Sequence, residues 1–215
     1  DLVRSRGLGE VYKRQAKGRA EVGEVDVLVN NSGGSRDLLF RQMTVEDWNA
    51  VIASNLNSLF NLTKQVVDGM ATRGWGRIIN IGSVSAHKGQ IGQVNYATAK
   101  AGIAAMTIVL ARELQKYGVT VNAIAPRART RMTESVLGAL LPEEGAFDEW
   151  DPANIAPVVA WLASDAAADI TGQVLVVNGD KVHLMAGWDR CGRIENGGTR
   201  WTIADLEAKR GELFG

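Results

Sequence analysis

The chain has 215 residues, enough for one domain with a well-buried core or for two small domains. Lys+Arg and Asp+Glu both number 24, so no net charge favours a nucleic acid or an anionic membrane as partner. The single cysteine, Cys191, has no disulfide partner, and no Cys/His cluster has metal-ligand spacing, so we expect a cytoplasmic protein without a metal. No apolar run approaches the length of a membrane span, and no signal-peptide pattern is present.

The first fifteen residues show no apolar periodicity of either the helical or the strand kind. Residues 11–15 also resemble the translation of a transposase adapter used in sequencing libraries. We therefore interpret residues 1–15 as a non-native, adapter-like leader, with a disordered basic tail as the alternative. A reading frame in the source DNA that continues upstream of residue 1 would contradict the leader interpretation.

Four short apolar runs are predicted to be strands buried on both faces, because each is continuous rather than alternating in polarity. They comprise residues 26–30, 77–81, 119–124 and 173–177. Helical patterns separate them. The expected helices run from a capping box of Thr44 and Asp47 to about Met70, from Val94 to Lys116 with Gly118 as the stop, and from about Pro152 to Ala163.

Strands that alternate with helices predict an α/β fold with parallel strands and right-handed crossovers. Ligands bind such sheets at the carboxyl ends of the strands. Chemistry is therefore expected in the segments that follow the strands, which are residues 30–34, 82–92, 126–132 and 178–180. Residues 133–151 have no clear periodicity and are predicted to form a mobile loop.

Tyr96 and Lys100 are four residues apart in a predicted helix, so their side chains lie on one face. A nearby ammonium favours the phenolate and brings a tyrosine towards use as an acid or base near neutral pH. Ser83 ends a predicted strand thirteen residues earlier, where its hydroxyl can converge with the phenol on one substrate oxygen. A surface Tyr–Lys pair and a turn serine are the alternatives.

Several segments together resemble one known family, the short-chain dehydrogenases/reductases. The similarity extends over about residues 18–180, and the motifs occur in the family's order. The matching segments are residues 26–33, 54–60, 76–86 followed by 95–101, 121–126 and 170–179, with Ser32 where the family has Ala. The resemblance implies a Rossmann-like, doubly wound parallel sheet and a nicotinamide cofactor, NAD or NADP.

The resemblance also implies roles for individual residues. Tyr96 would exchange a proton with the substrate, and Ser83 would bind the same oxygen. Lys100 would lower the Tyr96 pKa and hold the nicotinamide ribose, while Asn55 would fix a water that links Lys100 to solvent. The implied catalytic residues are Asn55, Ser83, Tyr96 and Lys100, and the implied cofactor-binding residues are Asn31, Gly33, Tyr96, Lys100, Pro126 and Thr130.

Two departures from the family pattern matter. The glycine-rich phosphate loop Thr-Gly-x-x-x-Gly-x-Gly is absent from the sequence, so we expect an N-terminally truncated chain that lacks the first βαβαβ half. That half would carry the residue that separates NAD from NADP, and its absence would expose a central strand. Arg127 stands where the family usually has Gly, as part of a phosphate clamp or of a solvated basic loop.

We accordingly expect three segments, namely the leader, a Rossmann part over residues 16–180 and a C-terminal extension over residues 181–215. The extension and the loop after Pro126 resemble dehydrogenases that act on 3-hydroxyacyl-CoA thioesters or steroids. The leading hypothesis is an oxidoreductase that interconverts a secondary alcohol and a ketone. A non-catalytic binding domain and an inactive fragment are the alternatives. Relatives assemble through their two long helices, so we expect a homodimer or homotetramer.

Overall fold

The computed structural model describes residues 23–130, 133, 141–143, 145–187 and 190–214. The predicted leader lies outside these residues, as does most of the first half of the predicted mobile loop. The chain forms two compact units, Asp1–Met185 and Ala186–Gly215. The second unit contains α8 (Ile203–Ala208) and α9 (Arg210–Phe214), and Thr202 caps α8 through a capping box with Asp205.

The first unit is built on a five-stranded sheet with the order β1-β2-β3-β4-β5. Neighbouring strands from β1 to β4 are parallel, which confirms the four predicted strands and the parallel α/β fold. Their bounds are β1 Val27–Asn30, β2 Gly76–Ile81, β3 Val119–Arg127 and β4 Val174–Asn178.

A fifth strand, β5 (Lys181–Leu184), pairs antiparallel with β4, whereas the sequence prediction placed these residues in a C-terminal extension. Asn178 pairs with Lys181 across a two-residue turn, and Gly179 has φ 56°, in the left-handed region. The two loop residues are Gly179 and Asp180, and a glycine at the first of two loop positions is typical of such a hairpin. The first compact unit therefore continues to Met185 rather than ending near residue 180.

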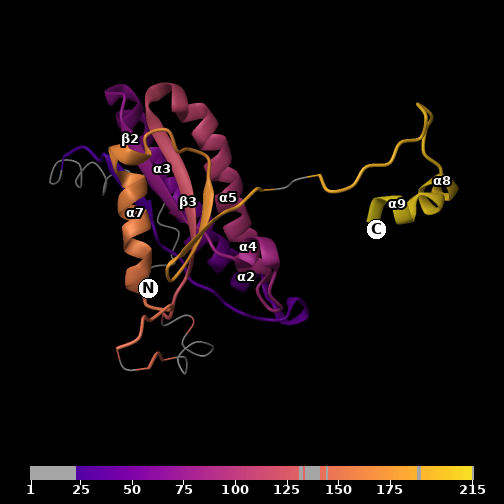
Figure 1. The fold of residues 1–215 in the computed structure, drawn as a ribbon, viewed down its shortest axis with the longest axis horizontal. Helices are drawn as coiled ribbons and strands as arrows, with labels where there is room; N and C mark the ends of the chain where they lie inside the picture. Colours follow the sequence, from indigo (N-terminus) through magenta and orange to yellow (C-terminus); the bar gives the residue numbers. More distant parts are fainter. Residues whose placement is uncertain (1–22, 131–132, 134–140, 144, 188–189, 215) are drawn as a thin grey trace. The chain divides into compact units, whose positions relative to one another are not determined.

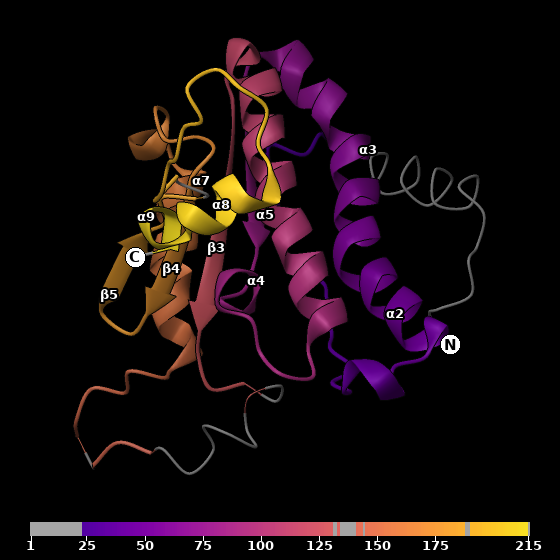
Figure 2. The ribbon, with the colours of Figure 1, turned by 90° about the vertical axis from the view of Figure 1, so that its right-hand side faces the viewer.

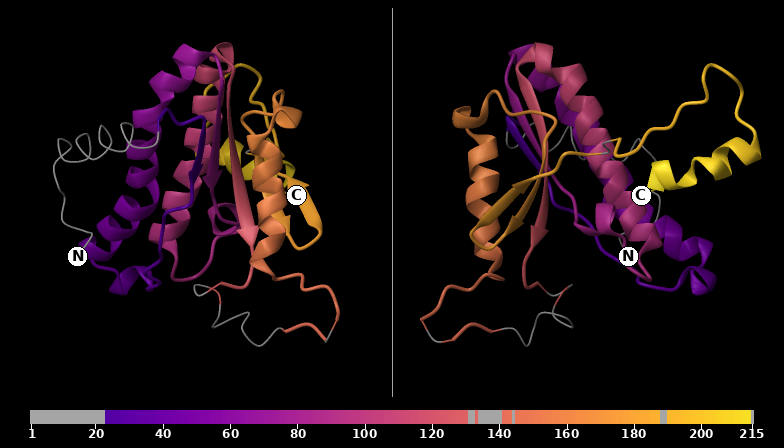
Figure 3. Two further views of the ribbon diagram at one scale, coloured as in Figure 1. Left: turned by 90° about the vertical axis from the view of Figure 1, so that its left-hand side faces the viewer. Right: turned by 45° about the vertical axis from the view of Figure 1, so that its right-hand side comes forward.

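Helices cover both faces of the sheet (Figures 1 and 3). One face carries α2 (Val45–Ile52), α3 (Ser58–Arg73) and α5 (Val94–Leu114), and the other carries α7 (Ala156–Ala163). The shorter segments are η1 Phe40–Gln42, α4 Ser85–Lys88, η3 Gln115–Tyr117, η4 Pro152–Ile155 and η5 Asp165–Ala167. The three predicted helices are confirmed, and the one-turn helix α4 is an addition to the prediction.

The predicted helix from Thr44 to Met70 is a continuous helical run with an internal irregularity. The capping box of Thr44 and Asp47 is present at its start. Between α2 and α3, η2 (Ala53–Asn57) is a π-helical turn. Single π-helical turns inside α-helices are rare overall, and those that do occur are often at functional sites. This turn carries Asn55, one of the predicted site residues.

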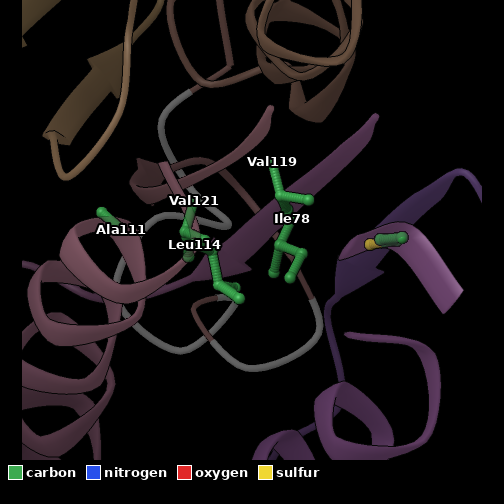
Figure 4. Close-up of a cluster of buried hydrophobic side chains, with 6 residues drawn as sticks. Ile78, Ala111, Leu114, Val119 and Val121 are labelled. Carbon is green, nitrogen blue, oxygen red and sulfur yellow. The ribbon is translucent and has the colours of Figure 1, made fainter. Parts of the chain in front are cut away.

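One of two hydrophobic core clusters lies between α5 and the sheet (Figure 4), and the other lies on the side of α7. Ala111 and Leu114 of α5 pack towards Ile78 of β2 and towards Val119 and Val121 of β3, which alternate with polar residues along their strand. By length and composition, residues 94–117 would suffice to cross a membrane, contrary to the sequence prediction. Here the helix packs on the sheet as a core element, and core helices pass the same test.

The strand β1 lies at the edge of the sheet in the described part of the chain. Val27 is 38% exposed and Val29 is 41% exposed, although the sequence pattern is that of a strand buried on both faces. The exposed strand expected from the sequence is therefore present. Exposed apolar edge strands favour pairing with other chains.

Candidate active site

The carboxyl ends of β1, β2 and β3 border a cavity of about 750 Å³. The start of α5 and part of α7 complete its walls. Figure 2 shows how these two helices lie relative to the strands. All eight residues predicted for the site line this cavity, namely Asn31, Gly33, Asn55, Ser83, Tyr96, Lys100, Pro126 and Thr130. These residues come from five separate segments of the chain, and the fold brings the segments together around one cavity.

Ser83 and Tyr96 form the polar centre of the cavity. Ser83 follows β2, and its Oγ accepts a hydrogen bond from the Ser85 amide at 3.2 Å. Burial raises the pKa of Tyr96 above its ordinary value of 10.0, the hydrogen bond with the Ser83 side chain lowers it, and the Asp37 carboxylate raises it again. The net direction is upward, so the phenol holds its proton in this geometry.

Lys100 lies one helical turn after Tyr96 and is only 5% exposed. Its Nζ donates a hydrogen bond to the Ile81 carbonyl at 2.8 Å and lies 5.5 Å from the centre of the Tyr96 ring. Burial lowers the pKa of Lys100 to about 8. The expectation that Lys100 lowers the Tyr96 pKa is therefore not met without a ligand, because burial outweighs the other effects at Tyr96.

Asn55 is buried in the π-helical turn. Its Nδ2 donates hydrogen bonds to the carbonyls of Val51 at 2.9 Å and Gly34 at 2.8 Å. Its Oδ1 is buried without a hydrogen-bond partner in the described part of the chain. A Cβ at Gly33 would lie 2.3 Å from this Oδ1 and 3.6 Å from the Lys100 Nζ, so glycine is required there. Both polar atoms thus face the same point beside Gly33.

The end of β3 supplies the opposite side of the cavity. Arg127 is exposed, lines the cavity and lies 5.1 Å from the centre of the Trp150 ring. Arg129, in contrast, forms an ion pair with Asp148, and its amide donates to the Trp150 carbonyl at 2.7 Å. These contacts hold residues 148–150 against β3.

Of the three arginines at positions 127, 129 and 131, Arg127 alone lines the cavity among the described residues. Arg129 is engaged by Asp148 instead of lining the cavity, and Arg131 lies outside the described residues. Thr130 lines the cavity as predicted, and its amide donates to Thr133 Oγ1 at 2.8 Å. Arg127 has no ion-pair partner among the described residues, as the phosphate-clamp hypothesis requires.

Sequence reasoning did not single out seven polar or aromatic residues of the cavity: Ser35, Asp37, Ser85, Gln90, Gln93, Thr133 and Trp150. Ser85 falls in a segment that was predicted to carry chemistry, but nothing distinguished it from its neighbours. Asp37 and Gln93 lie in connecting segments without periodicity. Only the hydrogen bonds between them reveal their place in the site.

The described residues contain no cluster of three or more His, Cys, Asp or Glu side chains able to hold a metal ion. A nicotinamide ribose fits the polar groups that are present. The Lys100 ammonium uses one donor on Ile81, and the Asn55 Oδ1 has no partner. The absent Cβ at Gly33 leaves room beside both atoms. These features are those of a cradle for a polyhydroxyl group.

The chain belongs to the short-chain dehydrogenase family, whose sequence model matches residues 9–138. Members of this family are NAD(P)-dependent oxidoreductases with a Rossmann-type fold, which agrees with the parallel sheet and its helical layers. A crystal structure of a short chain dehydrogenase from Mycobacterium avium is similar, with a TM-score of 0.81 and 39% sequence identity. The likeness covers 96% of this chain and 70% of that one.

Two curated relatives illustrate the similarity in sequence. An acetoacetyl-CoA reductase from Cupriavidus necator is 50% identical over 168 residues, which are 76% of this chain and 68% of the relative. Hydroxyacyl-CoA dehydrogenase ChsB1 from Mycobacterium tuberculosis is 40% identical over 202 residues, which are 90% of this chain and 64% of the relative. The chain thus spans about two thirds of the length of these relatives.

Proposed function

We propose that this chain carries the reaction centre of an oxidoreductase that interconverts a secondary alcohol and a ketone, with Tyr96 as the acid/base. The observation that carries the proposal is the convergence of Ser83, Tyr96, Lys100 and Asn55 on one cavity. Fold alone does not define a reaction, but this set supplies a proton donor, a hydrogen-bond donor and a buried ammonium together.

In the reductive direction, Tyr96 gives its proton to the substrate oxygen, and the Ser83 hydroxyl donates a hydrogen bond to the same oxygen. A nicotinamide held beside Lys100 would supply the hydride to the carbonyl carbon in this direction. Lys100 holds the nicotinamide ribose and places a positive charge near the phenolate that Tyr96 becomes. Asn55 offers its Oδ1, which has no partner among the described residues, to a water through which a proton from solvent can return to Tyr96.

The substrate is proposed to be a 3-oxoacyl or 3-hydroxyacyl thioester. Three relatives bear names of this kind, including a 3-oxoacyl-[acyl-carrier-protein] reductase FabG from Escherichia coli that is 47% identical over 166 residues. The apolar wall formed by Pro152, Ile155 and Val159 suits an acyl chain. A steroid is the alternative substrate, and both NAD and NADP remain candidate cofactors. We place the enzyme in the cytoplasm.

A kinetic assay with acetoacetyl-CoA tests this function, with oxidation of NADH and NADPH followed by absorbance. Because no segment of the sequence matches the glycine-rich phosphate loop, the assay has two arms. One uses the 215-residue chain, and the other uses residues 23–215 fused behind the N-terminal part of the Cupriavidus necator reductase that precedes the matched region. We expect turnover in the fusion and no NADH binding by the chain alone, as the inactive-fragment hypothesis predicts.

The decisive variant in the fusion is Tyr96→Phe, which removes the acid/base oxygen and keeps the ring. Turnover is expected to fall by about a thousandfold with little change in cofactor affinity. The matched control is Tyr117→Phe, because Tyr117 also lies beside a lysine, Lys116, but is exposed and far along the same helix. Retained activity in Tyr96→Phe would remove Tyr96 from its proposed role, and a fusion without turnover would favour a non-catalytic binding domain.

We further propose that the protein is a homodimer or homotetramer that assembles through α2, α3 and α5. These helices expose several large apolar side chains, namely Val45, Phe60, Leu62, Val94 and Val109. Exposed apolar patches of this kind mark contact surfaces. Light scattering should give a mass at least twice that of the chain, and Phe60→Glu should reduce it to the monomer. A monomeric wild-type protein would contradict this assembly.

A further inference from the structure

A continuous chain of hydrogen bonds leads from the rim of the cavity to Ser83. The Asp37 Oδ2 accepts from the Gln93 Nε2 at 2.8 Å, and the Gln93 Oε1 accepts from the Ser85 Oγ at 2.9 Å. The Ser85 amide then donates to the Ser83 Oγ at 3.2 Å. All four residues line the cavity, and they come from the loop after β1, from the end of β2 with α4, and from the residue that caps α5.

The direction of these hydrogen bonds is fixed by chemistry. A carboxylate only accepts, so Asp37 holds the amide of Gln93 with its Nε2 outward and its Oε1 towards Ser85. The Ser85 hydroxyl must then donate to Gln93. Ser83, which accepts from the Ser85 amide, keeps its own proton for Tyr96 or for a substrate oxygen. Without the carboxylate, the Gln93 amide has no reason to prefer one orientation.

The same contacts fix the position of α4. This helix has only four residues, too few to be stable without tertiary support. Its connection to α5 contains two glycines with positive φ, Gly89 and Gly92. Ser85, which is 8% exposed, ties α4 to Gln93, the residue directly before α5. Since Tyr96 lies in the first turn of α5, this tie sets the place of the Ser83 turn relative to Tyr96.

We propose that Asp37, Gln93 and Ser85 are positioning residues, which hold the Ser83 hydroxyl against Tyr96 and direct its proton at the reacting oxygen. This inference rests on the proposed function for its catalytic meaning, but the geometry exists without any ligand. It gives the connecting segments after β1 and before α5 a role in the orientation of the catalytic serine.

The hydrogen-bond chain from Asp37 through Gln93 and Ser85 to Ser83, called the relay below, can be tested through the charges around Tyr96. Asp37 faces it from the loop after β1 and Lys100 from α5, while Arg127 lines the same cavity from the end of β3. Asp37 opposes formation of the phenolate, so its carboxylate raises the Tyr96 pKa. Asp37→Asn keeps the shape of the side chain and removes this charge, and the Tyr96 pKa is expected to fall.

The experiment uses the full chain without ligand. Hydrogen exchange is measured at the amides of residues 86–89, which bond to Ser83, Val84 and Ser85 within the α4 turn. Gln93→Met, which removes both side-chain hydrogen bonds, is expected to speed this exchange about tenfold. In parallel, the Tyr96 phenol is titrated by carbon NMR in wild type and Asp37→Asn, with Tyr96→Phe to assign the signal.

Matched controls are Gln115→Met, at the far end of α5, and Asp68→Asn, an exposed carboxylate on α3. Neither is expected to change the exchange of α4 or the Tyr96 titration. Unchanged exchange in Gln93→Met, or an unchanged Tyr96 pKa in Asp37→Asn, would overturn the relay. Both readouts need no turnover, so if both hold while the fusion reduces no ketone, the proposed function alone is refuted.

Discussion

Replacement of Lys100 by Met tests how much the burial of the Lys100 charge lowers the free energy of unfolding. The Lys100 ammonium is almost fully buried, and among the described residues its only hydrogen-bond acceptor is the carbonyl of Ile81, with no carboxylate in contact. Burial lowers its pKa from an ordinary 10.5 to about 8. One pKa unit is worth about 1.4 kcal/mol, so this shift corresponds to roughly 3 kcal/mol of stability.

The sign follows from proton binding. Below about pH 8 Lys100 is protonated in both states, and the folded protein carries the full cost of the buried charge. Between about pH 8 and 10.5 the unfolded chain binds more protons than the folded protein, so the free energy of unfolding rises with pH. Lys100→Met has no such charge. Its advantage over wild type is therefore largest near pH 7 and decreases by roughly 3 kcal/mol as the pH approaches 10.5.

Urea unfolding at a series of pH values from 7 to 10, at constant ionic strength, measures this difference. Subtraction of the two curves cancels the other titrating groups, and the lost hydrogen bond to Ile81 adds only a constant. The comparison is repeated in a Tyr96→Phe background, so that the neighbouring phenol cannot produce the effect. A difference between wild type and Lys100→Met that stays constant from pH 7 to 10 would refute the reasoning.

Three further substitutions, one of them with a matched control, test particular contacts. Gly118→Ala should destabilise the protein by about 2–4 kcal/mol, because the residue has φ 69° and its Cβ would lie 2.2 Å from the Gly74 carbonyl oxygen. Gly74→Ala, with φ 71° and open space around its Cβ, should cost only about 1 kcal/mol, and equal losses in urea unfolding would contradict the close approach. Gly33→Ala should abolish cofactor binding in the fusion, since its Cβ would lie 2.3 Å from the Asn55 Oδ1 and displaces that side chain; tight binding of NADH would contradict the cradle. Arg127→Ala should change stability by less than about 0.5 kcal/mol and weaken CoA binding about tenfold in calorimetry, and unchanged affinity would leave Arg127 as a solvated residue.

The sequence by itself determined the layered α/β fold and most of the candidate site. Continuous apolar runs mark parallel strands because helices cover both of their faces, and that signal located four strands correctly. Spacing along a helix placed Tyr96 beside Lys100, since residues four apart always share a helical face. The end of a predicted strand pointed to Ser83, motif resemblance added Asn55, and all of these residues line the cavity.

The tertiary structure decided what depends on contacts between distant segments. The sequence predicted that Lys100 lowers the Tyr96 pKa, but burial, which depends on the whole fold, sets the opposite net direction. Arg127 lines the cavity and Arg129 does not, because Arg129 forms an ion pair with Asp148, nearly twenty residues later in the chain. Asp37 and Gln93 carry no local pattern, because a hydrogen bond between two loops requires only that the fold bring them together. Local periodicity reports the average environment of an element, whereas the electrostatics of a site depend on which individual side chains meet there.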